Sequence, residues 1–146
     1  SALADQKELS MDPIQRWWLE RLQDAATYTG YTVWEKYAST ELLYEDFVKR
    51  CKTWGIMRAP SKTQLVNELQ GMTPEGSFEQ LRKTIEIKGQ DGYVYDRRVW
   101  CYKMPKLEDC RRIMCERLGM TIAWPEEEVY EEEDPQDETD DGRPML

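Results

Sequence analysis

In the middle of the sequence, a signal for the end of one helix is followed, after a short turn, by a signal for the beginning of the next. Gly55 follows a segment whose apolar residues recur every three or four positions, and glycine commonly stands just beyond a helix C-terminus. Ser61-Lys62-Thr63-Gln64 is a capping box, in which each end residue's side chain accepts a hydrogen bond from the other's backbone N–H. We therefore predict two consecutive helices, the first capped by Ser39 or Thr40 and the second closed by Gly71 and Pro74. Their predicted apolar stripes are Leu43, Phe47, Cys51 and Trp54 in the first helix, and Leu65, Val66, Leu69 and Met72 in the second.

Two strand-forming segments follow these helices, from Phe78 to Ile87 and from Tyr93 to Met104. The residues between them, Gly89-Gln90-Asp91-Gly92, have the composition of a hairpin turn. Because side chains alternate between the faces of a strand, Leu81, Lys83, Ile85 and Ile87 share one face. The sequence therefore predicts a β-hairpin that carries several bases, namely Arg82, Lys83, Lys88, Arg97 and Arg98.

One further helix is predicted on each side of this central unit. Asp12-Pro13 is a helix start, and the apolar residues behind it, which include Trp17 and Trp18, fall at helical spacing. We expect both tryptophans to pack in a core instead of stacking on bases. A last helix is expected from Lys106 to Leu118, ending at Gly119, and the segment from Tyr31 to Tyr37 is expected to be a loop or a brief strand. The predicted fold class is α+β: a winged helix-turn-helix with an additional N-terminal helix, a C-terminal helix and a disordered acidic tail.

The charge of the chain is very unevenly distributed. The net charge is −9, but residues 126–146 alone hold 11 acids and one base, which leaves 18 acids and 19 bases, a net +1, in residues 1–125. A dense acidic segment repels itself and buries little apolar surface. We therefore expect a flexible segment at 1–11, a winged-helix domain at 12–125 and a disordered tail at 126–146. The tail either docks on a basic replication partner or acts only as a solubilising segment.

The residue types that usually carry catalysis are scarce. The chain has no histidine, and its four cysteines, Cys51, Cys101, Cys110 and Cys115, form no C-x-x-C pair. We therefore expect no catalytic residue, no metal and no cofactor, and we expect the chain not to be an enzyme by itself. It lacks a long apolar span and a signal peptide, which indicates a cytoplasmic protein without a membrane partner. A start at Ser1-Ala2-Leu3, without an initiator methionine, indicates a fragment of a longer protein.

The candidate function is the binding of DNA, single- or double-stranded. In a winged helix the second helix of the pair can enter a major groove while the hairpin flanks the backbone. Glutamine and asparagine can pair with adenine there, and basic side chains neutralise phosphates. The candidate nucleic-acid-binding residues are Arg58, Lys62, Thr63, Gln64, Asn67, Gln70, Lys83, Lys88, Arg97 and Arg98. The helix face can also be an ordinary solvated one, on which Glu68 would repel phosphate. Two other functions remain open: a winged helix that docks on protein without contacting DNA, and a small enzyme that uses carboxylates.

Several of these motifs also suggest a family. The stretch Ser39-Thr40-Glu41-Leu42-Leu43-Tyr44, then Phe47, Cys51, Trp54-Gly55 and Ser61, resembles the C-terminal winged-helix domain of poxvirus-type and phage or plasmid primase-helicases of the primase-polymerase branch. The resemblance spans about residues 12–124 and implies a parent protein with a primase or polymerase first and a superfamily-three ATPase next. The P-loop sequence G-x-x-x-x-G-K-[ST] is absent, so ATP-dependent helicase chemistry is expected upstream, in a parent that can be oligomeric.

Overall fold

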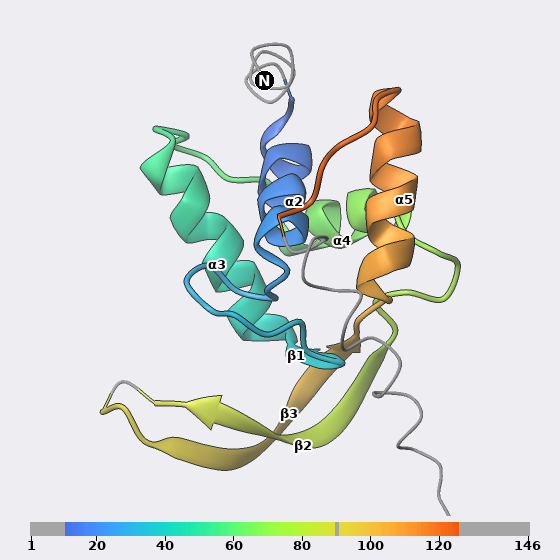
Figure 1. Cartoon of the computed structure of the whole chain (residues 1–146). Coiled ribbons are helices and arrows are strands. Elements are labelled where there is room, and N and C mark those ends of the chain that lie inside the picture. The colour runs from blue at the N-terminus through green and yellow to red at the C-terminus, as the bar shows by residue number, and fades with distance from the viewer. Residues whose placement is uncertain (1–10, 90, 126–146) are drawn as a thin grey trace, which may run out of the picture.

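The computed structural model describes residues 11–89 and 91–125, in which helices pack above one antiparallel sheet (Figure 1). The described residues form, in chain order, α2 (Pro13–Asp24), β1 (Tyr37–Ser39), α3 (Thr40–Thr53), α4 (Lys62–Gln70), β2 (Gln80–Lys88), β3 (Val94–Lys103) and α5 (Leu107–Leu118). The predicted α+β class is confirmed. The predictions for residues 1–10 and for the acidic tail at 126–146 fall outside the described residues.

The helices start where the capping residues predict. Asp12 accepts a hydrogen bond from the backbone N–H of Gln15 at 2.8 Å, and Pro13 follows it as the first residue of α2. Ser39 caps α3, while Ser61 and Gln64 form the complete capping box of α4, with N···O distances of 2.9 and 3.1 Å. These caps satisfy backbone N–H groups that a helix leaves without a partner in its first turn.

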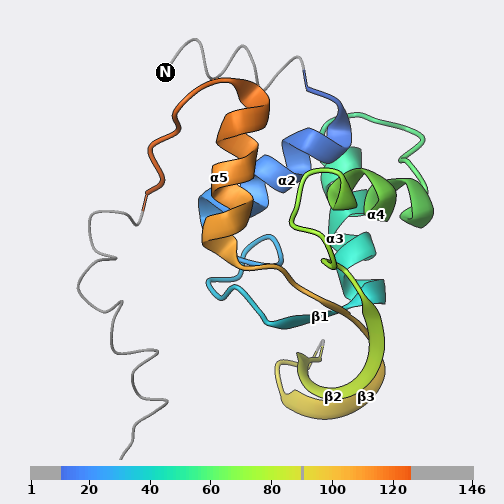
Figure 2. The ribbon, with the colours of Figure 1, turned by 90° about the vertical axis from the view of Figure 1, so that its right-hand side faces the viewer.

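The sheet has the strand order β1-β3-β2, with both pairs antiparallel. Residues 31–36 form a loop, one of the two outcomes expected for this segment, and β1 begins only at Tyr37, because the preceding backbone is hydrogen-bonded elsewhere. The N–H of Thr27 donates to the carbonyl of Val33 at 2.9 Å, and the N–H of Glu35 donates to the Thr27 hydroxyl at 2.7 Å. As a result β1 pairs only with the end of β3 at residues 101–103. The rest of the β2–β3 hairpin runs beyond the end of β1 and curls beneath it (Figures 1 and 2), where hairpin residues line one pocket with Tyr37 and Leu42.

The core lies between the helices and the upper face of the sheet. Trp17 and Trp18 are fully buried, which confirms their predicted place in the core. The Trp17 ring meets Phe47 of α3 edge-on at 5.6 Å between centroids, and Trp18 meets Phe78 at 5.8 Å. Edge-to-face aromatic pairs of this kind add stability beyond the apolar area that they bury. The two tryptophans therefore tie α2 to α3 and to the segment that leads into β2.

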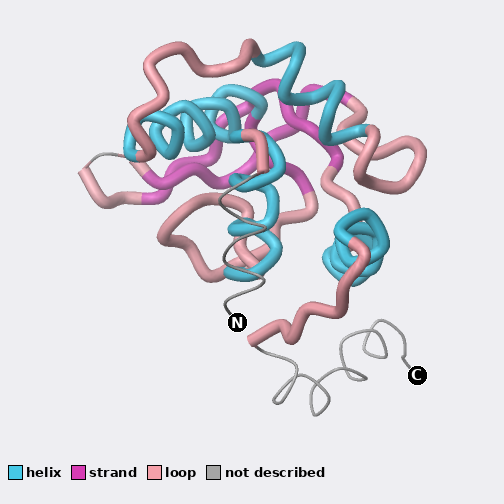
Figure 3. The backbone as a smooth tube through the Cα atoms, turned by 90° about the horizontal axis from the view of Figure 1, so that it is seen from above, coloured by secondary structure: helices cyan, strands magenta, loops and turns pink. Residues whose placement is uncertain are grey.

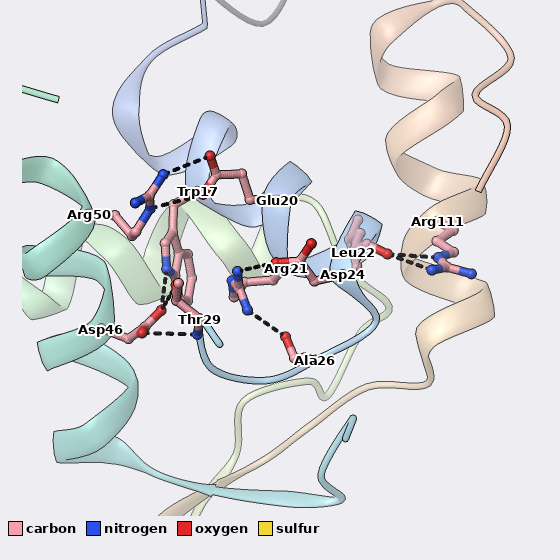
Figure 4. Close-up of polar contacts among 10 residues, drawn as sticks. All are labelled: Trp17, Glu20, Arg21, Leu22, Asp24, Ala26, Thr29, Asp46, Arg50 and Arg111. Atoms are coloured by element: carbon pink, nitrogen blue, oxygen red, sulfur yellow. Dashed lines mark hydrogen bonds and ion pairs between the residues drawn. The ribbon is translucent and has the colours of Figure 1, made fainter. Parts of the chain in front are cut away.

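Polar contacts join α2 to its neighbours around this core (Figure 4). Arg50 of α3 holds Glu20 of α2 through two hydrogen bonds of 3.1 Å each. Arg111 of α5 donates to the backbone carbonyl of Leu22 at 3.0 and 2.6 Å. Viewed from above, α5 stands nearly end-on beside the other helices (Figure 3), so Arg111 anchors it to the end of α2. The helical layer is therefore a cross-linked support for the hairpin below it.

Candidate nucleic-acid interface

The polar face predicted on α4 reaches solvent. Thr63, Gln64, Asn67 and Gln70 are all exposed. Two of these side chains already form hydrogen bonds within the protein. Gln64 accepts from the N–H of Ser61 in the capping box, and Gln70 Nε2 donates to the Ser77 carbonyl at 3.4 Å. The predicted exposure is confirmed, but the Gln64 carbonyl and the Gln70 amide are partly committed to the protein itself.

A shallow acidic groove lies beside this face. Gln64, Asn67 and Glu68 line it together with Asp12 at the start of α2. Burial, followed by a hydrogen bond to Asp12 and the negative charge of Asp12, raises the pKa of Glu68 to about 7. The Glu68 carboxyl therefore lies beside Asp12 and is hydrogen-bonded to it instead of standing alone in solvent. Because two acidic side chains and no base line this groove, α4 offers little attraction to phosphate on this side.

The two bases expected at the start of α4 differ in accessibility. Arg58 is exposed in the turn after α3, whereas Lys62, the first residue of α4, is half-buried. Residues 61–71 contain one base, Lys62, and one acid, Glu68, and are therefore neutral. The helix and its turn supply polar side chains but little net charge.

The β2–β3 hairpin carries the charge that α4 lacks. Residues 80–103 contain six bases and three acids, a net +3. The register divides the predicted bases between the two faces, since residues directly opposite in an antiparallel pair share a face. Lys83 and Arg97 share one face with Ile85, which we call the inner face, whereas Lys88 and Arg98 share the other, the outer face. Near the tip, however, Lys88 also lines the pocket between the hairpin and the body.

On the inner face the predicted bases are only partly available. Lys83 is half-buried, and its Nζ lies 4.6 Å from the centroid of the Tyr37 ring, which is a cation–π contact. Arg97 is exposed further along the hairpin. Between the hairpin and the body lies a pocket of about 460 Å³, which neither base lines; its lining residues include Tyr28, Tyr31, Tyr37, Ile85 and Ile87. Lys83 therefore serves partly to hold the hairpin against β1.

The outer face contains a pair that sequence reasoning missed. The register places Arg82 directly opposite Trp100, and the Arg82 guanidinium carbon lies 5.6 Å from the centroid of the indole. Trp100 is nevertheless 50% exposed. On the same face Thr84 pairs with Arg98, next to this pair. Counting outward from the predicted Gly89–Gly92 turn pairs Lys88 with Tyr93 and places Arg82 opposite Val99, one residue away from the observed register, in which Lys88 faces Val94.

The acids of the hairpin lie nearer its tip. Glu86 stands directly opposite Asp96, and Asp91 in the turn accepts hydrogen bonds from the Tyr95 hydroxyl and from the Tyr93 N–H. These hydrogen bonds, with that from Tyr95 the stronger influence, lower the pKa of Asp91. The half of the outer face nearer the body therefore presents Arg82, Thr84, Arg98 and Trp100 without a carboxylate among them. We call these four residues the outer platform.

The cysteines offer no exposed nucleophile in this region. Cys51, Cys101 and Cys110 are buried and Cys115 is half-buried. Burial, with a smaller contribution from Asp109, raises the pKa of Cys110 to about 12. Within residues 11–89 and 91–125, no group of three or more histidine, cysteine, aspartate or glutamate side chains is arranged to hold a metal ion. No helix in that part of the chain is long and apolar enough to cross a membrane.

Comparison with known proteins adds no assignment. No family model matches the sequence, and no curated protein and no solved structure gives a significant match.

Proposed function

We propose that this chain is a nucleic-acid-binding module with a winged-helix arrangement. The element order supports the proposal: α2, β1, the consecutive helices α3 and α4, and then the β2–β3 hairpin, with β1 pairing on β3. In such an arrangement the second helix of the pair and the hairpin are the elements that meet a nucleic acid.

The observation that carries the proposal is the net +3 charge of the projecting hairpin. Arg82, Lys88, Arg97 and Arg98 are exposed on it, and it extends beyond the helices and β1 (Figure 1). Basic side chains on a projecting hairpin can reach the phosphate backbone of a nucleic acid without a steric clash with the rest of the protein. The near-neutral face of α4 supports a secondary role, in which Thr63 or Asn67 contacts base edges or sugars.

The resemblance to primase-helicases gives the proposed biological setting. There the module would position DNA for a longer phage or mobile-element replication protein, whose ATPase and primase or polymerase lie outside this chain. A basic replication partner for the acidic tail remains a prediction, because residues 126–146 fall outside the described residues.

A second candidate function is docking on a protein, as a winged helix without DNA contact. The observation that favours it is the apolar tip of the hairpin, where Tyr93, Val94 and Tyr95 are 68%, 59% and 45% exposed. Exposed aromatic residues are enriched at protein interfaces.

Fluorescence anisotropy with labelled DNA tests the proposed function. The double variant Arg97→Gln/Arg98→Gln is expected to weaken binding by about tenfold at low salt, because it removes two phosphate-neutralising charges. Lys49→Gln/Lys52→Gln is the matched control, since it removes two exposed charges from α3 and gives the same net charge.

The control variant is expected to bind within about twofold of the unaltered chain. Absence of DNA binding by the unaltered chain would refute the proposal and favour protein docking. Equal losses in the two double variants would show that net charge, and not the hairpin, governs binding.

A further inference from the structure

We propose that the outer platform is a stacking site for an unpaired base, so that the hairpin binds single-stranded nucleic acid through Trp100. The inference rests on the proposed nucleic-acid function and specifies the form of nucleic acid that the hairpin takes. The nucleobase stacks on the indole ring of Trp100. The guanidinium groups of Arg82 and Arg98 bind the neighbouring phosphates.

The exposure of Trp100 sets it apart from the other tryptophans. The chain has six, of which Trp17, Trp18 and Trp124 are buried and Trp34 and Trp54 are half-buried. Trp100 alone among them is half exposed, at 50%. It belongs to a strand that is paired along its length with β2, so the ring stands on a defined surface and not on a loose loop. Stacking a nucleobase on this ring would therefore cost less conformational entropy of the protein than stacking it on a mobile aromatic side chain.

The charges around Trp100 match a phosphate backbone. Arg82 lies across the strand pair at 5.6 Å from the ring centroid, and Arg98 is two residues earlier on the same strand and face. Thr84, opposite Arg98, adds a hydroxyl that can donate to a phosphate oxygen. The acids of the outer face, Glu86 and Asp96, stand opposite each other in the strand register, nearer the tip. They therefore do not lie between the indole and these arginines.

An indole at this place favours a single strand over a duplex. In a duplex each base is covered above and below by its neighbours, so an aromatic side chain reaches only an edge. An unpaired base offers its whole face, and stacking on an aromatic residue stabilises such complexes whatever the sequence of the strand. Exposed aromatics with basic residues on a β-surface are the arrangement by which several folds bind unpaired bases.

Titration of the full chain with a single-stranded oligothymidylate and with a duplex of the same length tests the inference. The Trp100→Ala variant is expected to weaken single-strand binding by about 5- to 150-fold, the equivalent of losing one base stack, and to change duplex binding by less than about twofold. The Trp100→Phe variant keeps an aromatic ring and is expected to retain most of the affinity. Quenching of tryptophan fluorescence by the oligothymidylate should vanish in both variants, because Trp100 is the most exposed tryptophan.

The melting temperature of Trp100→Ala serves as the folding control and should stay close to that of the unaltered chain. Unchanged single-strand affinity of a folded Trp100→Ala protein would overturn the inference while leaving the proposed function standing. Equal losses on single strand and duplex would also overturn it, because they would give the indole no role specific to unpaired bases. If the unaltered chain binds neither form, the proposed function and this inference fail together.

Discussion

The indole N–H of Trp17 donates a 3.0 Å hydrogen bond to the carboxylate of Asp46, which joins the buried face of α2 to the middle of α3 (Figure 4). The same carboxylate accepts from the backbone N–H of Thr29 at 3.0 Å and from its hydroxyl at 2.8 Å. One side chain therefore fixes two helices and the loop that follows α2. Such a carboxylate is expected to matter more for stability than its partial exposure suggests.

Replacing Asp46 by alanine should lower the free energy of unfolding by about 1–3 kcal/mol, because the buried indole N–H of Trp17 would lose its hydrogen-bond acceptor. Urea denaturation followed by circular dichroism measures this loss. The neighbouring exposed residue supplies the control: Glu45→Ala should change stability by no more than about 0.5 kcal/mol. Equal effects of the two substitutions would show that the Asp46 hydrogen bonds carry no net stabilisation.

Replacing Trp17 by alanine should cost about 3–5 kcal/mol, because the ring is fully buried against Phe47 and leaves a large cavity. The midpoint of chemical denaturation reports the change. If Trp17→Ala kept full stability but lost affinity for single-stranded DNA, the tryptophan would be a base-stacking residue and its place in the core would be wrong.

The paired carboxyls Asp12 and Glu68 predict how stability depends on pH. Burial, and then the hydrogen bond to Asp12 and its charge, raises the pKa of Glu68 to about 7 in the folded chain, above the unperturbed value of 4.5. The folded state therefore binds a proton more tightly than the unfolded state, so this group's stabilisation is complete below about pH 4.5 and is lost as the pH rises through about 7.

Glu68→Gln should remove this dependence, because an amide can donate to Asp12 at every pH. Thermal melts between pH 5 and pH 8 should show a smaller loss of stability on raising the pH in Glu68→Gln than in the unaltered chain. Parallel pH profiles for the two proteins would mean that Glu68 titrates at its ordinary pKa.

The acidic tail should compete with DNA for the bases of the hairpin. Residues 126–146 hold 11 acids and one base, so a chain truncated after residue 125 should bind DNA more tightly at low salt. The difference should disappear at high salt, where charges are screened. Equal affinities of the two chains at low salt would contradict this self-competition.

Local signals in the sequence predicted most of the fold. The capping residues Asp12, Ser39 and Ser61 act within a few residues of themselves, so the starts of α2, α3 and α4 are readable without knowledge of the tertiary structure. The position of β1 was not readable in this way. The backbone of Val33 and Glu35 bonds to Thr27, and only the tertiary fold decides between that loop and a longer strand.

The candidate site was predicted less completely than the fold. Residue type alone identified Arg97 and Arg98, but it gave no sign that Lys83 lies over Tyr37 or that Glu68 is hydrogen-bonded to Asp12. Both contacts join residues far apart in the chain. The pairing of Arg82 with Trp100 depends on hairpin register, which side-chain alternation along a single strand does not specify.

The salt dependence of DNA binding tests the central claim, that the hairpin neutralises phosphates, most directly. The slope of the logarithm of the binding constant against the logarithm of salt concentration reports how many phosphates are neutralised, at about −0.9 for each on duplex DNA. Titrations at several salt concentrations should give Arg97→Gln/Arg98→Gln a slope smaller in magnitude by about 2 than that of the unaltered chain, with Lys49→Gln/Lys52→Gln unchanged. The same slope for all three proteins would contradict the assignment of the hairpin as the surface that binds nucleic acid.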